Sequence, residues 1–238
     1  MTEPVLIPAL DGEGTIPAYL ARPTGQPKAA IIVVPEIFGV NDGIRARCDR
    51  WAGKGYLAVA PDIFWRFAPG QEYDPDVPDQ FQKALDNMNT YVGAQTDGRN
   101  DGVADAQAVA NWLRRDQGVS KVGLVGYCLG GRIAYLVAAR TDMDATVGYY
   151  GVMIDQALNE AQAIANPLML HIAGADAFVP VEAQAAIHAG LDDHPRVTLC
   201  DYPGLNHGFA VESGERRNEE AATLADGRTE AFFAEHLA

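Results

Sequence analysis

The chain has 238 residues, of which 48% are hydrophobic and 21% are charged, and its formal net charge is −14 at pH 7. These proportions are ordinary for a globular protein and exclude a wholly disordered chain. The acidic balance argues against a nucleic-acid partner, because phosphate binding needs clustered Lys and Arg. No apolar run approaches the roughly 20 residues that span a bilayer, so we expect no membrane partner either.

The N-terminus, "MTEPVLIPALDGEG", lacks the basic start and the apolar core of a signal peptide. The three cysteines, Cys48, Cys128 and Cys200, are too few and too scattered for a disulfide framework or a CxxC metal site. We therefore expect a cytoplasmic protein with free thiols and no metal. The length fits a single domain over residues 1–238, present as a monomer or a small homo-oligomer.

Taken in chain order, the first elements are a hairpin-like pair of strands in "PVLIPALDGEGTIPAYLARP", turning at Asp11-Gly12. Short apolar, β-branched runs then predict strands over residues 29–34, 56–60, 121–126, 145–150, 167–173 and 196–202. Helical spacing separates them over residues 44–54, 101–114, 129–140 and 181–191. Such alternation indicates an α/β fold with a mostly parallel sheet that helices cover on both faces.

Residues 64–100 interrupt this alternation. They are rich in Pro, Asp and Gln, and only residues 79–91 show weak helical patterning. We interpret the segment as an excursion over the sheet rather than a second domain. Long excursions of this kind often line or cover a site.

A candidate nucleophile lies in "KVGLVGYCLGG", where Gly126-Tyr127-Cys128-Leu129-Gly130 follows a predicted strand and precedes a predicted helix. G-x-S-x-G forms a nucleophile elbow in this context, and here sulfur replaces the hydroxyl. The sharp turn leaves no room for neighbouring side chains, and the helix N-terminus favours a thiolate and a developing oxyanion. Alone the motif is weak, because glycine-rich turns also bind phosphates and a buried cysteine is often inert filler.

The partners that a nucleophile elbow needs follow in the required chain order, first an acid and then a histidine. Asp176 comes after the strand in "PLMLHIAGADAFVP", and His207 comes after the strand in "RVTLCDYPGLNHGF". His171 lies within a strand, and the remaining histidines lie on helices or helix ends. Two alternatives stay open: a surface-loop histidine, and Asp176 as a turn acid or as the cap of the helix near Val181.

Glu36 follows an apolar strand in "IIVVPEIFGVN", at the carboxyl edge where open α/β sheets collect functional groups. A solvated loop glutamate is one interpretation. The other is a partly buried carboxylate in a packed turn, able to take a proton from the thiol. The N–H groups of Ile37 and Leu129 would then supply the oxyanion hole.

With these residues assembled, the chain resembles the dienelactone hydrolase family through "PEIFGVN", "GYLAVAPD", "KVGLVGYCLGG", "VGYYG", "GADAFVP" and "NHGF". The resemblance implies an α/β-hydrolase fold in which Cys128 is the nucleophile, His207 the base and Asp176 its orienter. It also implies that Glu36 partners the resting thiol and accepts its proton when substrate binds. Acyl transfer from an ester or lactone through a thioester follows, with no cofactor.

The sequence departs from the family where substrate is bound. Members that cleave dienelactone hold its carboxylate with arginines, and here Val211 and Phe81 stand near those positions. Lys83 lacks the planar fork of arginine, Arg66 and Arg99 are possible substitutes, and Arg216 and Arg217 fit a solvated face better. We expect an apolar pocket formed by Phe38, Phe81, Leu85, Met88, Tyr149, Phe209 and Val211.

Three functions therefore compete. The first is hydrolysis of dienelactone-like substrates, and the second is hydrolysis of neutral or hydrophobic esters on the same fold. The third, a non-catalytic binding or thiol-sensing protein, requires the whole Cys, His, Asp and Glu set to be unused. Turnover of an activated ester by the wild type but not by Cys128→Ala would separate the first two from the third.

Overall fold

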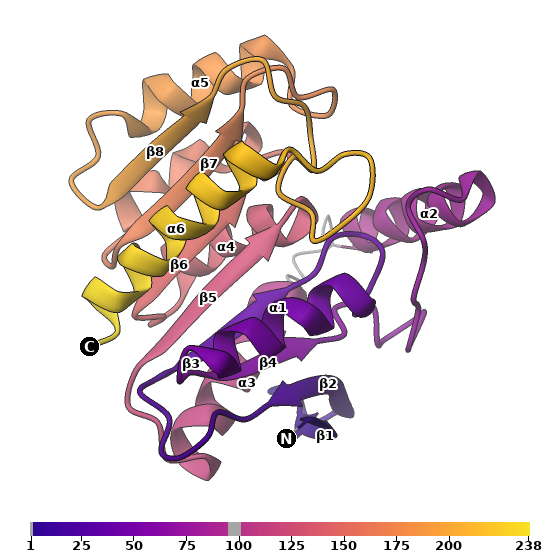
Figure 1. The fold of residues 1–238 in the computed structure, drawn as a ribbon, viewed down its shortest axis with the longest axis vertical. Helices are drawn as coiled ribbons and strands as arrows, with labels where there is room; N and C mark the ends of the chain where they lie inside the picture. The colour runs from indigo at the N-terminus through magenta and orange to yellow at the C-terminus, as the bar shows by residue number, and fades with distance from the viewer. Residues whose placement is uncertain (1, 95–100) are drawn as a thin grey trace.

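The computed structural model describes residues 2–94 and 101–238. Within that part of the chain the strands form one eight-stranded sheet in the order β1-β2-β4-β3-β5-β6-β7-β8 (Figure 1). The strands are β1 (Thr2–Pro8), β2 (Thr15–Ala21), β3 (Ala30–Val34), β4 (Leu57–Pro61), β5 (Val122–Tyr127), β6 (Ala145–Tyr149), β7 (Leu168–Ala173) and β8 (Val197–Tyr202). The helices are α1 (Asp42–Gly53), α2 (Pro78–Ala94), α3 (Asp101–Asp116), α4 (Leu129–Arg140), the 3-10 helix η2 (Asp155–Ala163), α5 (Val181–Leu191) and α6 (Glu219–His236).

The pairing of the strands follows the sequence pattern. β1 and β2 form the predicted antiparallel hairpin, closed by the pair Pro8 and Thr15 on either side of the turn at Asp11-Gly12. From β4 through β3 and on to β8 the neighbours are parallel. Every residue of β3, β5, β6 and β7 is buried, as expected for parallel strands covered on both faces. The predicted α/β-hydrolase type of sheet is confirmed.

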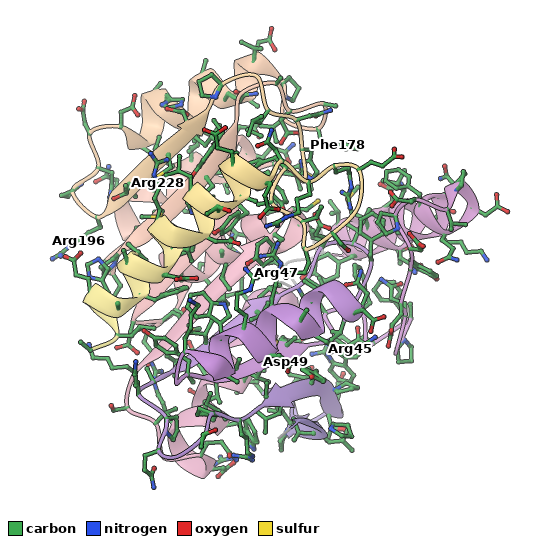
Figure 2. The ribbon with its side chains drawn as sticks, in the orientation of Figure 1. Arg45, Arg47, Asp49, Phe178, Arg196 and Arg228 are labelled. Carbon is green, nitrogen blue, oxygen red and sulfur yellow. The ribbon has the colours of Figure 1, made fainter. Side chains whose placement is uncertain are left out.

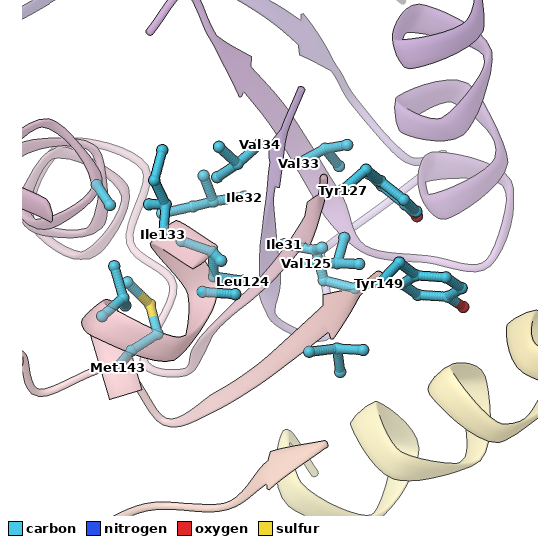
Figure 3. Packing of buried hydrophobic residues seen from close by; sticks show 14 of the residues in the cluster. Ile31, Ile32, Val33, Val34, Leu124, Val125, Tyr127, Ile133, Met143 and Tyr149 are labelled. Carbon is cyan, nitrogen blue, oxygen red and sulfur yellow. The ribbon is translucent and has the colours of Figure 1, made fainter. Parts of the chain in front are cut away.

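Helices cover both faces of the sheet. α1 and α6 lie over one face, and α3 and α4 lie over the other, with α5 beside β8 (Figure 1). Figure 3 shows Tyr127 and Tyr149 pointing to the side of α1 and α6, whereas Ile133 and Met143 lie on the opposite side of the central strands. The core therefore has two layers, one on each side of β3, β5 and β6.

The excursion contains a longer helix than the sequence predicts. α2 runs for 17 residues from Pro78, whose fixed φ suits the first helical position. It extends to one side of the sheet (Figure 1), and its inner face carries Phe81, Leu85 and Met88, packed against the core. The local helix propensity is weak, and packing of this apolar face stabilises the helix further. The sequence pattern therefore predicts a shorter helix than the structure contains. Arg99 lies outside the described residues.

The parallel order determines where loops meet. Because β3, β5, β6, β7 and β8 all run in the same direction, the loops that follow them gather at a single edge of the sheet. The candidate residues Glu36, Cys128, Asp176 and His207 all lie in these loops or at their borders. None of the described helices is long and apolar enough to cross a membrane.

Candidate active site

Cys128 lies at the turn between β5 and α4 in a strained backbone conformation. Its φ of 56° and ψ of −113° are rare for a residue with a side chain. A Cβ on Gly126 would overlap the backbone of Gly130, and a Cβ on Gly130 would lie 2.5 Å from the carbonyl oxygen of Val34. The turn therefore requires the two glycines of the G-x-C-x-G motif, as a nucleophile elbow does.

Helix α4 begins at Leu129, so its first N–H groups have no partner within the helix. Because Cys128 is the residue just before the helix, it lies at the positive end of the helix dipole. Ile37 lies in the neighbouring turn after β3 and borders the same cavity as Cys128. The N–H groups of Leu129 and Ile37 thus remain the candidates for an oxyanion hole.

His207 and Asp176 form a close pair. Nδ1 of His207 lies 3.0 and 2.9 Å from the two carboxylate oxygens of Asp176, and both residues are buried. Because a carboxylate only accepts, Nδ1 carries the proton and Nε2 is left for another partner. Asp176 also accepts a hydrogen bond from the backbone N–H of Phe178 at 2.8 Å. It does not cap α5, whose N-cap residue is Pro180.

The electrostatics connect this pair to Cys128. Burial lowers the pKa of His207, but electrostatic interaction with Cys128 and the hydrogen bonds with Asp176 outweigh it, and the pKa rises to about 10. An imidazolium beside a thiolate is the ion pair that activates cysteine nucleophiles. The sequence-predicted trio is therefore assembled in one place, on three separate loops.

Glu36 is buried, with 8% of its surface exposed, but it makes no hydrogen bond with Cys128. Its Oε1 has no hydrogen-bond partner among residues 2–94 and 101–238. Its Oε2 lies 3.7 Å from Nη2 of Arg216, beyond hydrogen-bond distance. The structure thus places Glu36 at the site, while its contact with the thiol stays a prediction.

A cavity of about 140 Å³ opens beside Cys128 and His207. We call it the acyl cavity, and its walls are largely apolar. The predicted residues Phe38, Phe81, Leu85 and Met88 line it, and so do Val152, Met153 and Phe178, which the sequence analysis did not single out. Figure 2 shows Phe178 near the loop that follows β8. Phe178 is 51% exposed, and its ring packs edge-on against the His207 ring with 4.9 Å between the centroids. It therefore lies at the outer edge of the acyl cavity.

Three predicted pocket residues lie elsewhere. Tyr149 faces α6, where its hydroxyl bonds Asp226 and Thr229, because successive residues of a strand point to opposite faces. Phe209 is enclosed between the rings of Tyr150 and Tyr202. Val211 borders a separate, polar cavity. The expectation that these three line the acyl cavity is therefore corrected.

The positions of the basic residues relative to the acyl cavity follow the expectation only in part. Arg216, expected on a solvated face, lines the acyl cavity with its guanidinium 5.5 Å above the ring of Phe38. Arg217 pairs with the exposed Glu219, and Lys83 is exposed on α2. Arg66 pairs with Asp11 and Asp105, away from the cavity. Among the arginines of residues 2–94 and 101–238, Arg216 is thus the one that lines the acyl cavity.

No group of three or more His, Cys, Asp or Glu side chains suited to a metal ion occurs within the described part of the chain. Cys48 and Cys200 are buried, like Cys128. Burial raises the pKa of the Cys200 thiol. Neither thiol borders the acyl cavity, so Cys128 is the thiol with the chemical setting of a nucleophile.

Comparisons with known proteins identify the family of the chain. Residues 16–237 match the model of the dienelactone hydrolase family. The chain is 36% identical to carboxymethylenebutenolidase of Pseudomonas putida, with 98% of this chain and 97% of the relative covered. It is 33% identical to carboxymethylenebutenolidase 1 of Cupriavidus pinatubonensis, with 91% and 90% covered.

A crystal structure from Klebsiella pneumoniae, which carries a provisional dienelactone hydrolase name, superposes with a TM-score of 0.81 at 29% identity, with 98% of each chain covered. A dienelactone hydrolase from Anabaena variabilis has the same fold, with a TM-score of 0.69 at 16% identity and 100% of this chain and 99% of that chain covered. These matches span nearly the whole sequence. The chain therefore belongs to the dienelactone hydrolase family, whose members hydrolyse ester and lactone bonds.

Proposed function

We propose that the protein hydrolyses small esters or lactones with Cys128 as the nucleophile and a thioester as the intermediate. The observation that carries the proposal is the thiol at a strained strand-to-helix turn, on the same cavity as an imidazole that Asp176 holds from the other side. Serine is the usual residue at such an elbow. A thiolate paired with an imidazolium attacks carbonyl carbons without a further base.

In the acylation step the Cys128 sulfur attacks the carbonyl carbon of the substrate. The carbonyl oxygen becomes an oxyanion, for which the N–H groups of Leu129 and Ile37 are the proposed donors. As the tetrahedral intermediate collapses, the C–O bond breaks and His207 gives the proton on Nε2 to the leaving alkoxide. The neutral imidazole that results is ready to act as a base in hydrolysis of the thioester.

The acyl cavity favours neutral, apolar substrates. Phe38, Phe81, Leu85, Met88 and Phe178 surround the space beside the sulfur. Its volume of about 140 Å³ suits a short acyl chain or a single small ring. Burial of apolar groups there contributes roughly 25 cal/mol for each Å² removed from water.

Arg216 supports a second candidate substrate class, a lactone that carries a carboxylate. A guanidinium binds a carboxylate through two parallel hydrogen bonds. Arg216 borders the cavity from a position several residues beyond Val211, and it already faces Glu36 and Phe38. Competition with Glu36 makes the neutral substrate the better supported of the two.

The nucleophile is tested with p-nitrophenyl acetate. We expect the wild type to gain one acetyl group on the Cys128 peptide in quenched mass spectrometry, and Cys128→Ala to lose about 1,000-fold or more in kcat/KM without forming the adduct. Cys200→Ala, which alters a buried thiol distant from the cavity, should keep the wild-type rate. Equal turnover by wild type and Cys128→Ala would exclude the proposed mechanism.

The substrate class is tested with a lactone carboxylate and its neutral methyl ester. We expect the wild type to prefer the neutral form about tenfold or more in kcat/KM. We expect Arg216→Gln to change kcat/KM for the neutral form little. If carboxylated lactone binding depends on Arg216, the same substitution lowers kcat/KM for the anionic form by about 10- to 100-fold. That second result would favour the carboxylate-bearing class.

A further inference from the structure

A second cavity, of about 230 Å³, adjoins the acyl cavity and has a different character. We call it the polar chamber. It is lined by the start of α1, by residues 74–76, by residues 211–214 and by Arg216, with Tyr127 and Tyr150 among its other neighbours. Arg47, which lies between α1 and α6 in Figure 2, borders it and is held by Tyr127. Glu36 and Arg216 line both cavities, so they form the wall between them.

Two residues that line this chamber each carry a buried oxygen atom without a hydrogen bond to any residue that the structure describes. The two atoms are Oε1 of Glu36 and the hydroxyl of Tyr150, and the two residues are 8% and 2% exposed. An unsatisfied buried polar group costs about 1–3 kcal/mol. A buried water with two to four polar partners removes that cost, and the chamber has room for several waters.

The two oxygens lie close to the chemistry. Burial raises the pKa of Tyr150, and the Glu36 carboxylate raises it further, so the two groups are within electrostatic reach of each other. The ring of Tyr150 packs edge-on against His207, with 4.9 Å between centroids. A water held by Glu36 and Tyr150 would therefore lie beside the imidazole that must activate it.

The chamber also reaches solvent by its own route. Asp74, Asp76 and Ser213 border it and are exposed at its outer end. Once the thioester has formed, the acyl group lies in the apolar cavity between α2 and Phe178, whose walls offer few hydrogen-bond partners to water. Water that must reach the thioester then has a polar path on the other side of Glu36 and Arg216.

We propose that the polar chamber is a binding site for the hydrolytic water, held by the Tyr150 hydroxyl and Oε1 of Glu36, and that it supplies this water to the acyl-enzyme. The inference rests on the proposed thioester mechanism. The water oxygen bonds to the acyl carbon, and one proton passes to Nε2 of His207. The C–S bond breaks with its electron pair on Cys128, which releases a carboxylic acid and restores the thiolate and imidazolium pair. Tyr150 acts here as a positioning residue.

Single-turnover kinetics of Tyr150→Phe test the proposal. The substitution keeps the ring on His207 and removes only a hydroxyl without a protein partner among residues 2–94 and 101–238, so we expect wild-type thermal stability. With p-nitrophenyl acetate, acylation of Cys128 should stay within about twofold, while loss of the acyl group, followed by quenched mass spectrometry, should slow about tenfold. With 1-propanol present, a larger share of the acyl group should leave as propyl ester, because the alcohol enters through the apolar cavity.

A second variant blocks the route without touching the water site. Ser213→Trp places a large side chain at the exposed outer end, and we expect about threefold or slower loss of the acyl group. Glu215→Trp is the matched control, because Glu215 is exposed on the same loop and does not line the chamber. It should behave as the wild type.

The outcomes separate the two proposals. Unchanged deacylation and an unchanged propyl ester share in both Tyr150→Phe and Ser213→Trp would overturn the water site while leaving the thioester mechanism intact. A wild type that turns over substrate without any acyl group on Cys128 would instead remove the mechanism itself. Slower deacylation with normal acylation in both variants would support the water site.

Discussion

Cys128 keeps its φ of 56° at a cost of about 1–3 kcal/mol, which the packing of β5 against α4 must offset. The glycine spacing around it follows from steric necessity, so the elbow could be predicted from sequence. Asp176 and His207 could be predicted as well, because each lies in a loop after a predicted strand and the order of acid and base is specific. Arg216 could not, since it lies in a loop whose path follows no hydrophobic period.

At this scale we predict the effect of Asp176→Asn. The amide cannot stabilise an imidazolium, so the pKa of His207 should fall below its value of about 10, and the ring loses its orienting partner. We expect kcat/KM for an activated ester to drop by about 100- to 10,000-fold. NMR titration of His207 and steady-state kinetics are the measurements. Asp192→Asn removes an exposed carboxylate from His188 and serves as the control; a similar loss there would count against a specific role for Asp176.

Among the elements, β6 shows why the pocket was only partly predicted. Tyr149 ends the strand and Tyr150 follows it, so neighbouring side chains go to different sides. The sequence cannot say which tyrosine faces the site, and we expected Tyr149. The structure puts Tyr150 against His207 and assigns Tyr149 to a hydrogen-bonded network beneath α6. The central parallel strands were predicted well because they are almost entirely apolar, whereas α6 lacks a clear apolar stripe and its bounds were not predicted.

The network beneath α6 leads to a pH prediction. Nδ1 of His171 lies 2.8 Å from the Tyr202 hydroxyl and Nε2 lies 2.9 Å from the Thr229 hydroxyl. Burial lowers the pKa of His171 to about 3, so the folded protein keeps it neutral. The unfolded chain binds a proton below about pH 6.5. The free energy of unfolding must therefore fall as pH drops from 6.5 towards 3, by about 2 kcal/mol at pH 5 from this residue.

His171→Asn isolates this contribution. The variant should be less stable at pH 7 by about 1–3 kcal/mol, because the buried hydroxyls of Tyr202 and Thr229 each lose their hydrogen bond with the imidazole. Its free energy of unfolding should then change less between pH 7 and pH 5 than that of the wild type. Urea unfolding at the two pH values gives both numbers. Equal pH slopes in the two proteins would mean that His171 is not neutral in the folded state.

At the scale of the whole molecule, the edge of the sheet that carries the candidate site also carries acidic side chains. The parallel strands deliver their loops to one side, where Cys128, Asp176 and His207 lie. Asp74 and Asp76 lie at the outer end of the polar chamber on this side, and the formal net charge of the whole chain is −14 at pH 7. An anionic substrate therefore approaches against a negative field, whereas a neutral ester does not.

Salt distinguishes the two substrate classes through this field. Between 0.01 and 0.1 M ionic strength the Debye length shrinks from about 30 to about 10 Å, which screens the distant charges. We expect kcat/KM for a lactone carboxylate to rise about threefold over this range and the value for its neutral methyl ester to stay constant. Steady-state kinetics on the matched pair measure both. A fall for the anionic substrate would mean that the local charge of Arg216 dominates the approach, because screening then weakens an attraction rather than a repulsion.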